Sequence, residues 1–190
     1  MKTFLSSLIL ISINFQLVAQ KKDAEIQIGY FAPYITNIGG SIGFAFELKK
    51  WESTSTSNRI KLHRLQLLSQ LSYFNQPGVA NNIFFNPEII YKWRKSNKRF
   101  YLASSIGTGY LLSSQRQEGK LNLATGNLDY QNELRNYFAP NINLGFGVDP
   151  LKNIGFYFKT LYGRKFTMGA DNAAFFGVSL GVLIKIKSKN

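Results

Sequence analysis

The stretch from Ala173 to Lys187 constrains the fold most, because its side chains change character at every second residue. One set is Phe176, Val178, Leu180, Val182, Ile184 and Ile186. The other set is Phe175, Gly177, Ser179, Gly181, Leu183, Lys185 and Lys187. Alternate side chains of a strand point to opposite faces, so this pattern predicts a strand with one apolar face and one mostly small or polar face. The apolar face extends over about 11 residues, which suits a tilted strand that crosses a lipid bilayer.

The same alternation recurs throughout the 190-residue chain. The other predicted strands are Glu25 to Tyr34, Ile38 to Lys50, Ile60 to Phe74, Asn82 to Arg94, Phe100 to Leu112, Phe138 to Val148 and Asn153 to Tyr162. The polar stretch 113–136 is predicted to protrude as a loop, with a small hairpin around Thr125-Gly126-Asn127, and Asp149-Pro150 is predicted as a turn. The chain is therefore expected to be all-β, with residues 20–190 forming an eight-stranded antiparallel up-and-down transmembrane β-barrel.

The N-terminus has the pattern of a secretory signal peptide. Met1-Lys2 is followed by an apolar run diluted by serine, asparagine and glutamine, and Ala19 supplies a small residue at the expected cleavage site. A membrane anchor would need about 20 predominantly apolar residues, so residues 1–19 are assigned as a signal peptide. The formal net charge of +13 would indicate a nucleic-acid partner in a cytosolic protein. For an exported protein it indicates anionic lipid, lipopolysaccharide or cell-wall polymer instead.

Alternation alone does not show which face is inside, because a soluble lipocalin-like barrel turns its apolar face inward and a membrane barrel turns it outward. The other face is rich in glycine, serine, alanine and asparagine, which fits a narrow eight-stranded interior. Long connections alternate with short ones, as in outer-membrane barrels. Tyrosine and tryptophan near strand ends predict an interfacial girdle of Tyr34, Trp51, Tyr73, Trp93, Tyr110 and Tyr162. These features favour the membrane barrel.

Charged residues occur on the face predicted to point inward. They are Glu25, Glu47, Lys49, Arg64, Glu88, Lys92, Arg94, Lys159 and Lys185. Isolated buried charges are costly, so we expect these side chains to pair. The pairs would form a network that fills the lumen, since eight strands leave only enough interior for side chains. The alternative is a proton path or a narrow porin-like pore.

With this strand pattern the chain resembles the small outer-membrane β-barrel proteins of the OmpA/OmpX-like type, over Glu25 to Lys187. The resemblance implies the outer membrane of a Gram-negative bacterium as the location. The barrel assembly machinery is then the expected partner during insertion, and Gly181, Ile184 and Ile186 are similar to its C-terminal signal. Lys187-Ser188-Lys189-Asn190 departs from that pattern, because the signal ends on phenylalanine. We expect a monomer.

Some eight-stranded barrels of this kind are enzymes that act on lipid A acyl chains, with a histidine toward the outer leaflet. The chain has one histidine, His63, which is predicted near the periplasmic end of its strand, so no catalytic residue is assigned. There is no cysteine and no ligand spacing typical of a metal site, and no cofactor is expected.

The expected function is that of a non-enzymatic outer-membrane barrel. Its extracellular loops, residues 113–136 and 163–172, would bind a ligand, a partner or a surface, or the barrel would have a structural membrane role. Basic loop residues that suit lipopolysaccharide phosphates are Arg116, Lys120, Arg164 and Lys165. The alternatives are a lipid A-modifying acyl enzyme and a soluble lipocalin-like lipid-binding barrel.

Overall fold

The structure is a computed structural model of the chain, and it describes residues 24–33, 37–54, 60–117, 119–121, 128–151, 153–166 and 173–186. The predicted signal peptide, residues 1–19, lies outside the described residues. The described residues include no helix of the length and apolarity that a membrane span requires.

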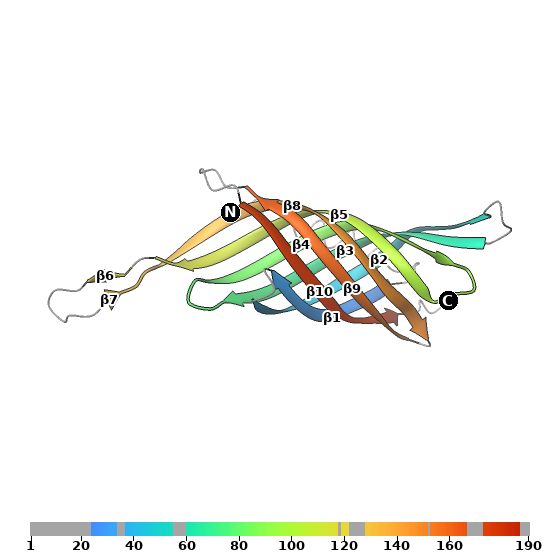
Figure 1. The fold of residues 1–190 in the computed structure, drawn as a ribbon, viewed down its shortest axis with the longest axis horizontal. Helices are drawn as coiled ribbons and strands as arrows, with labels where there is room; N and C mark the ends of the chain where they lie inside the picture. The colour runs from blue at the N-terminus through green and yellow to red at the C-terminus, as the bar shows by residue number, and fades with distance from the viewer. Residues whose placement is uncertain are drawn as a thin grey trace.

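Eight long strands form a closed barrel (Figure 1). They are β1 (Ala24–Pro33), β2 (Ile38–Thr54), β3 (Ile60–Gln76), β4 (Ala80–Lys95), β5 (Phe100–Arg116), β8 (Asn132–Leu151), β9 (Ile154–Lys165) and β10 (Ala173–Ile186). Each strand pairs antiparallel with its neighbours, and β1 closes the ring against β10. The predicted eight-stranded up-and-down barrel is confirmed.

The strands are longer than the sequence pattern predicts at several ends. The predicted loop 113–136 is partly strand, since β5 continues to Arg116 and β8 begins at Asn132. Between them, β6 (Lys120–Leu121) pairs with β7 (Leu128–Asp129), as the predicted hairpin requires. Its predicted turn, Thr125-Gly126-Asn127, lies outside the described residues.

The predicted turn at Asp149-Pro150 is wrong, because both residues lie within β8. The β8–β9 pairing shifts register between Val148 and Leu151, close to the strand end. Such an irregularity accommodates a proline, which has no N–H to donate to the ladder.

Large apolar side chains lie on the outside of the barrel. The exposed ones include Ile28, Ile42, Phe44, Leu71, Ile89, Leu102, Ile106, Ile142, Leu144, Phe156 and Leu180. Exposing so large an apolar surface to water is unfavourable, whereas contact with lipid hydrocarbon is not. This surface is therefore the lipid-facing exterior of a transmembrane barrel. The lipocalin-like alternative is wrong, because it requires these side chains to face inward.

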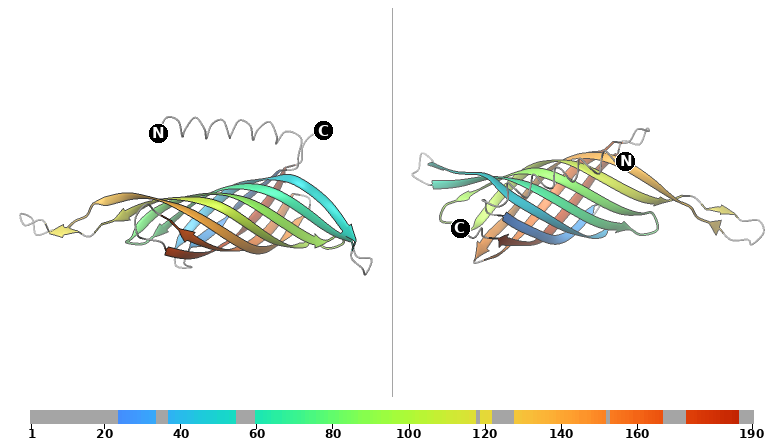
Figure 2. Two further views of the ribbon diagram at one scale, coloured as in Figure 1. Left: turned by 90° about the horizontal axis from the view of Figure 1, so that it is seen from above. Right: turned by 180° about the vertical axis from the view of Figure 1, so that it is seen from behind.

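The two ends of the barrel differ (Figure 1). At one end, β5 and β8 continue beyond the other strands as an extended pair that carries the β6–β7 hairpin; we call this extension, residues 113–136, the arm. We call this the arm end, and the opposite end, where Ala24 and Ile186 lie, the terminal end. Figure 2 shows the β2–β3 pair projecting at the terminal end, opposite the arm.

Candidate functional site

The lumen at the terminal end contains a cluster of ion pairs. Lys92 Nζ lies 2.8 Å from Glu25 Oε2, and Arg64 Nη1 lies 3.7 Å from Glu25 Oε1. Glu25 is 2% exposed and Lys92 is 4% exposed. Lys92 also lies over the ring of Tyr101, 5.0 Å from its centroid. The two cations compensate the buried charge of the Glu25 carboxylate. Because Glu25 is on β1, Arg64 on β3 and Lys92 on β4, these ion pairs connect the three strands across the lumen.

Asp149 extends the cluster to β8. Its Oδ2 lies 2.7 Å from Arg94 Nε and 3.4 Å from Arg64 Nη2. Arg64 also reaches Glu47 on β2, at 3.8 Å. Asp149 is absent from the predicted set because the sequence pattern placed it in a turn. The signal that would have found it is the surplus of predicted inward cations over anions.

A second polar network lies deeper, around Glu88, which is 1% exposed. Lys159 Nζ lies 2.7 Å from Glu88 Oε1 and also donates to Gln70 Oε1 at 2.9 Å. Ser105 and Asn143 donate to Glu88 Oε2 at 2.6 and 3.1 Å. Glu88 therefore accepts hydrogen bonds from several strands, and its charge is paired within the barrel.

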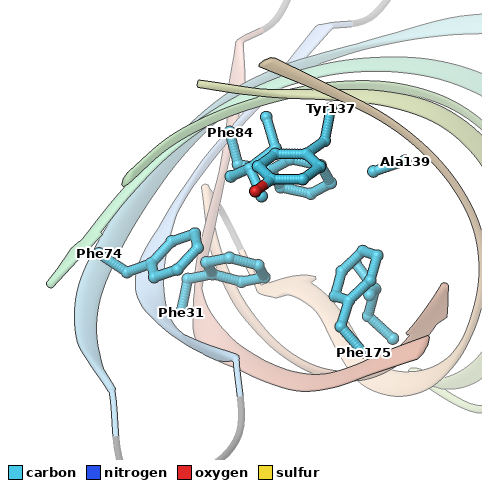
Figure 3. Packing of buried hydrophobic residues seen from close by; sticks show 8 residues of the cluster. Phe31, Phe74, Phe84, Tyr137, Ala139 and Phe175 are labelled. Atoms are coloured by element: carbon cyan, nitrogen blue, oxygen red, sulfur yellow. The ribbon is translucent and has the colours of Figure 1, made fainter. Parts of the chain in front are cut away.

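An aromatic cluster fills the lumen near the arm end (Figure 3). Its buried members are Phe31, Phe74, Phe84, Leu111, Tyr137, Ala139, Leu161 and Phe175. The ring centroids of Phe31 and Phe84 are 5.9 Å apart, and those of Phe84 and Phe175 are 6.1 Å apart. The sequence analysis missed this cluster, because on each strand its members occupy the face that is otherwise polar. Inward-pointing phenylalanines on several strands were the available signal.

The lumen is thus occupied along its length. A cavity between Gln27, Lys92 and Tyr157 measures about 30 Å³, and one between Arg64, Arg94 and Asp149 measures about 10 Å³. A cavity of the larger size holds about one water molecule. Within the described part of the barrel, neither of these two cavities is large enough to be an open channel.

Most of the predicted inward charges meet in these networks. Those in ion pairs are Glu25, Glu47, Arg64, Glu88, Lys92, Arg94 and Lys159. Lys185 is half-buried and pairs with Glu25 in the β1–β10 register, which places it on the inward face.

Lys49 is the exception, and its predicted inward position is wrong. The β2–β3 register shifts between Glu47 and Lys49, so Lys49 pairs with the outward Leu65. A bulge of this kind inserts one residue and reverses the faces of those that follow. The Lys49 ammonium is exposed and lies 5.7 Å from the Trp51 ring.

The four basic residues predicted to contact lipopolysaccharide lie in different settings. Arg116 stacks on Tyr130 in the arm, 3.5 Å from its ring centroid, and Arg164 is exposed on the outer wall. Lys165 lies on the inward face of β9, with its Nζ 5.8 and 5.7 Å from the ring centroids of Tyr137 and Phe175. The backbone of Lys120 lies in β6, and its side chain is outside the described residues.

The arm carries its own ion pair above the barrel. Arg135 donates from Nε to Glu133 Oε2 at 2.9 Å, and Gln117 donates to the same oxygen at 3.2 Å. The hydrogen bond from Arg135, and then that from Gln117, lowers the pKa of Glu133 below its usual value. The hydrogen bond from Gln117 joins the two sides of the arm, whereas Arg135 and Glu133 lie on the same strand, β8.

The predicted girdle residues within the described ranges face outward. At the arm end these are Tyr73, Tyr110 and Tyr162, which are 53%, 42% and 57% exposed. At the terminal end they are Trp51 and Trp93, with Lys61 lying 6.0 Å from the Trp93 ring centroid. Tyr34 lies outside the described residues.

His63 lies on the outer wall at the terminal end, where the sequence analysis expected it, and it has partners that were not expected. Ser53 Oγ lies 2.7 Å from His63 Nε2, and the Tyr91 hydroxyl lies 2.7 Å from His63 Nδ1. The Trp51 ring stacks on the imidazole, with 5.4 Å between the centroids. The imidazole is therefore held in place with a hydroxyl on each nitrogen.

Comparisons with solved structures agree with this architecture. The N-terminal β-barrel domain of Pseudomonas aeruginosa OprF matches with a TM-score of 0.51 and 13% identity, covering 87% of this chain and 98% of that one. The outer membrane enzyme PagL matches with a TM-score of 0.50 and 16% identity, covering 85% and 98%. The chain has the fold of the small outer-membrane β-barrels.

Neisserial surface protein A (NspA) aligns with a TM-score of 0.43 and 11% identity, covering 87% of this chain and 94% of that one. No family model matches the chain, and no curated protein matches its sequence. The likeness therefore concerns the fold alone.

Proposed function

We propose that the protein is a non-enzymatic integral barrel of the Gram-negative outer membrane, with the arm and the β9–β10 connection outside the cell. In this role the barrel is an anchor, and residues 113–136 and 163–172 bind a ligand, a partner or a surface. The main support for the proposal is that side chains fill the lumen, whereas β5 and β8 remain paired well beyond the ends of the other strands and form the arm.

The filled lumen argues against a transport role. Ion pairs at the terminal end, the Glu88 network and the aromatic cluster follow one another along the axis. An open pore would require several of these contacts to break at once. The arm, by contrast, is reinforced by the pairing of β5 with β8 and by the stacking of Arg116 on Tyr130.

The orientation can be tested by cysteine labelling, because the chain contains no cysteine of its own. Asn132→Cys places a thiol on the exposed arm, and Glu52→Cys places one at the terminal end. A membrane-impermeant maleimide applied to intact cells is expected to label Asn132→Cys only. Labelling of Glu52→Cys alone would reverse the proposed orientation.

The binding role of the arm needs a separate test. Replacing residues 118–130 by Asn-Gly keeps Gln117 and Gln131, whose backbones are hydrogen-bonded, and removes the tip. Cells that display the shortened barrel are expected to lose attachment to a solid surface relative to cells with the full chain. Equal attachment, with equal amounts of folded barrel in the membrane, would contradict a role for the tip.

A second candidate function is ester hydrolysis at the terminal end, and the contacts of His63 favour it. A serine hydroxyl beside one imidazole nitrogen and an orienting group on the other is the arrangement of an activated nucleophile. In that reaction Ser53 Oγ would attack an acyl carbonyl, and His63 would accept its proton and return it to the leaving alcohol. Water, deprotonated by His63, would then attack the acyl-serine and release the carboxylic acid, and His63 would return the proton to Ser53. A fluorophosphonate probe that labels the wild type but not Ser53→Ala would support this function over the non-enzymatic one.

A further inference from the structure

Three short side chains lie next to one another on the outer wall, in a surface otherwise covered by large apolar residues. Thr108 on β5 pairs with Pro140 on β8, and the β4 register places Pro87 on the other side of Thr108. Ser69 on β3 pairs with Pro87 and continues the row. We call this row, Ser69, Pro87, Thr108 and Pro140, the trough.

Large side chains border the trough on both sides. Toward the terminal end, paired positions across the same strands form a ridge of Leu67, Ile89, Ile106, Ile142 and Tyr162. Toward the arm end, paired positions form a second ridge of Leu71, Phe85, Tyr110, Phe138 and Phe166. A depression between two apolar ridges follows directly from this order of side-chain sizes.

A cavity of about 630 Å³ lies over Pro87, Thr108 and Pro140 and against the ridge on the terminal-end side, and Arg164 on β9 lines one end of it. Ser69 and the ridge on the arm-end side are not part of its lining. From β3 to β9 the cavity crosses five strands, which corresponds to about 19 Å at a spacing of ~4.8 Å. Arg164 is exposed near the arm end, so the trough combines an apolar channel with a single cation at its rim.

The floor of the trough is formed by residues of the barrel wall that also border the lumen, namely Glu88, Gly107, Asn141 and Gly163. Pairing of β4 with β5 is interrupted between Phe85 and Glu88, at the level of Pro87. Behind this gap, Asn141 donates to Asn86 Oδ1 at 2.8 Å. A Cβ on Gly107 would lie only 2.6 Å from that same Asn86 oxygen, so the floor is tightly packed. A ligand therefore stays on the outer wall.

We propose that the trough binds an acyl chain of lipid A, with a lipid A phosphate on Arg164. This proposal rests on the outer-membrane location and orientation proposed above. The position selects the ligand class, because hydrocarbon chains surround the outer wall of a transmembrane barrel. Acyl chains are as apolar as the ridges, so selectivity comes from the fit of the chain into the trough and from the guanidinium–phosphate contact.

Native mass spectrometry of the full chain in a non-ionic detergent, titrated with hexa-acylated lipid A, tests the site. Thr108→Phe fills the trough, and Arg164→Gln removes the cation. Thr160→Phe makes the same change on β9 outside the trough lining, and Lys61→Gln removes a cation at the opposite end. A heat-dependent shift in electrophoretic mobility verifies that each variant forms a closed barrel.

The wild type is expected to bind one lipid A. Thr108→Phe is expected to weaken binding at least tenfold, and both control variants are expected to bind like the wild type. Arg164→Gln is expected to weaken binding of lipid A but not of its dephosphorylated form. Unchanged binding by Thr108→Phe, an equal loss in Thr160→Phe, or displacement of lipid A by inorganic phosphate would each overturn the proposal.

Two further outcomes separate this site from the proposed function. Loss of lipid A binding when the tip of the arm is replaced would move the site to the arm and reject the trough. Labelling of Glu52→Cys in intact cells, together with Thr108-dependent lipid A binding in detergent, would reject the proposed orientation and leave the trough as a lipid site.

Discussion

Replacing Lys159 by methionine tests the central contact of the lumen. The change leaves the Glu88 carboxylate buried without its cation, while Ser105, Asn143 and Asn86 still donate hydrogen bonds to it. Removing one partner of a buried ion pair lowers the free energy of unfolding by about 3–5 kcal/mol. Because three neutral donors remain, we expect the free energy of unfolding to fall by about 3 kcal/mol, the lower end of that range.

A double variant, Glu88→Gln/Lys159→Met, distinguishes the contribution of the ion pair from the contribution of side-chain packing. Glu88→Gln alone leaves Lys159 with Gln70 as a hydrogen-bond acceptor, and we expect a loss similar to that of Lys159→Met. Removing both charges together avoids any unpaired buried charge, so Glu88→Gln/Lys159→Met is expected to lose about 1–2 kcal/mol, less than either single variant.

The assay is urea unfolding in phospholipid vesicles, followed by tryptophan fluorescence. Trp51 and Trp93 are the two tryptophans of the chain, and both lie on the outer wall, where leaving the lipid changes their emission. Lys49→Met is the matched control, because its ammonium is exposed and should contribute less than about 1 kcal/mol through Trp51. Equal losses for Lys49→Met and Lys159→Met, or additive losses in the double variant, would refute the reasoning.

Three more outcomes are expected. The wild-type protein in planar bilayers should show no stepwise conductance, because side chains fill the lumen. Regular conductance steps in the wild type, with the same size in Phe84→Ala, would show that the aromatic cluster does not close the lumen. Gly181→Val should lower the free energy of unfolding in urea by about 1–3 kcal/mol, because a Cβ there would collide with the backbone oxygen of Ile28. If the variant is as stable as the wild type, β1 and β10 can move apart enough to accommodate the side chain. Tyr130→Ala should speed proteolysis of the arm, because Arg116 loses its stacking partner; an unchanged cleavage rate would show that the stacking does not hold the arm.

The alternation of side chains was sufficient to predict the strands and the faces of most of them. Ile106 and Ile142 are exposed and Ser105 and Asn143 are buried, as the period of two requires. Strand ends were less predictable. Arg116 and Asn132 were assigned to a loop because polar residues were equated with loop, yet backbone pairing beyond the membrane does not need an apolar face.

Lys49 shows where the periodic argument fails. A bulge between Glu47 and Lys49 changes the face of each later residue on β2, and no residue in the sequence marks it. His63 shows a second limit. Its position was predicted, but its contacts with Ser53 and Tyr91 depend on the register of three strands.

The sequence by itself determined that the chain forms alternating strands, because the period of side chains along a strand is a local property. The tertiary structure decided which distant residues meet. Glu88 and Lys159 are 71 residues apart in the chain, and closure of the barrel places them 2.7 Å from each other. The trough was decided in the same way, since Pro87, Thr108 and Pro140 become neighbours only when β4, β5 and β8 pair in one register. Register across strands is set by the whole ring of pairings, and a single strand does not contain that information.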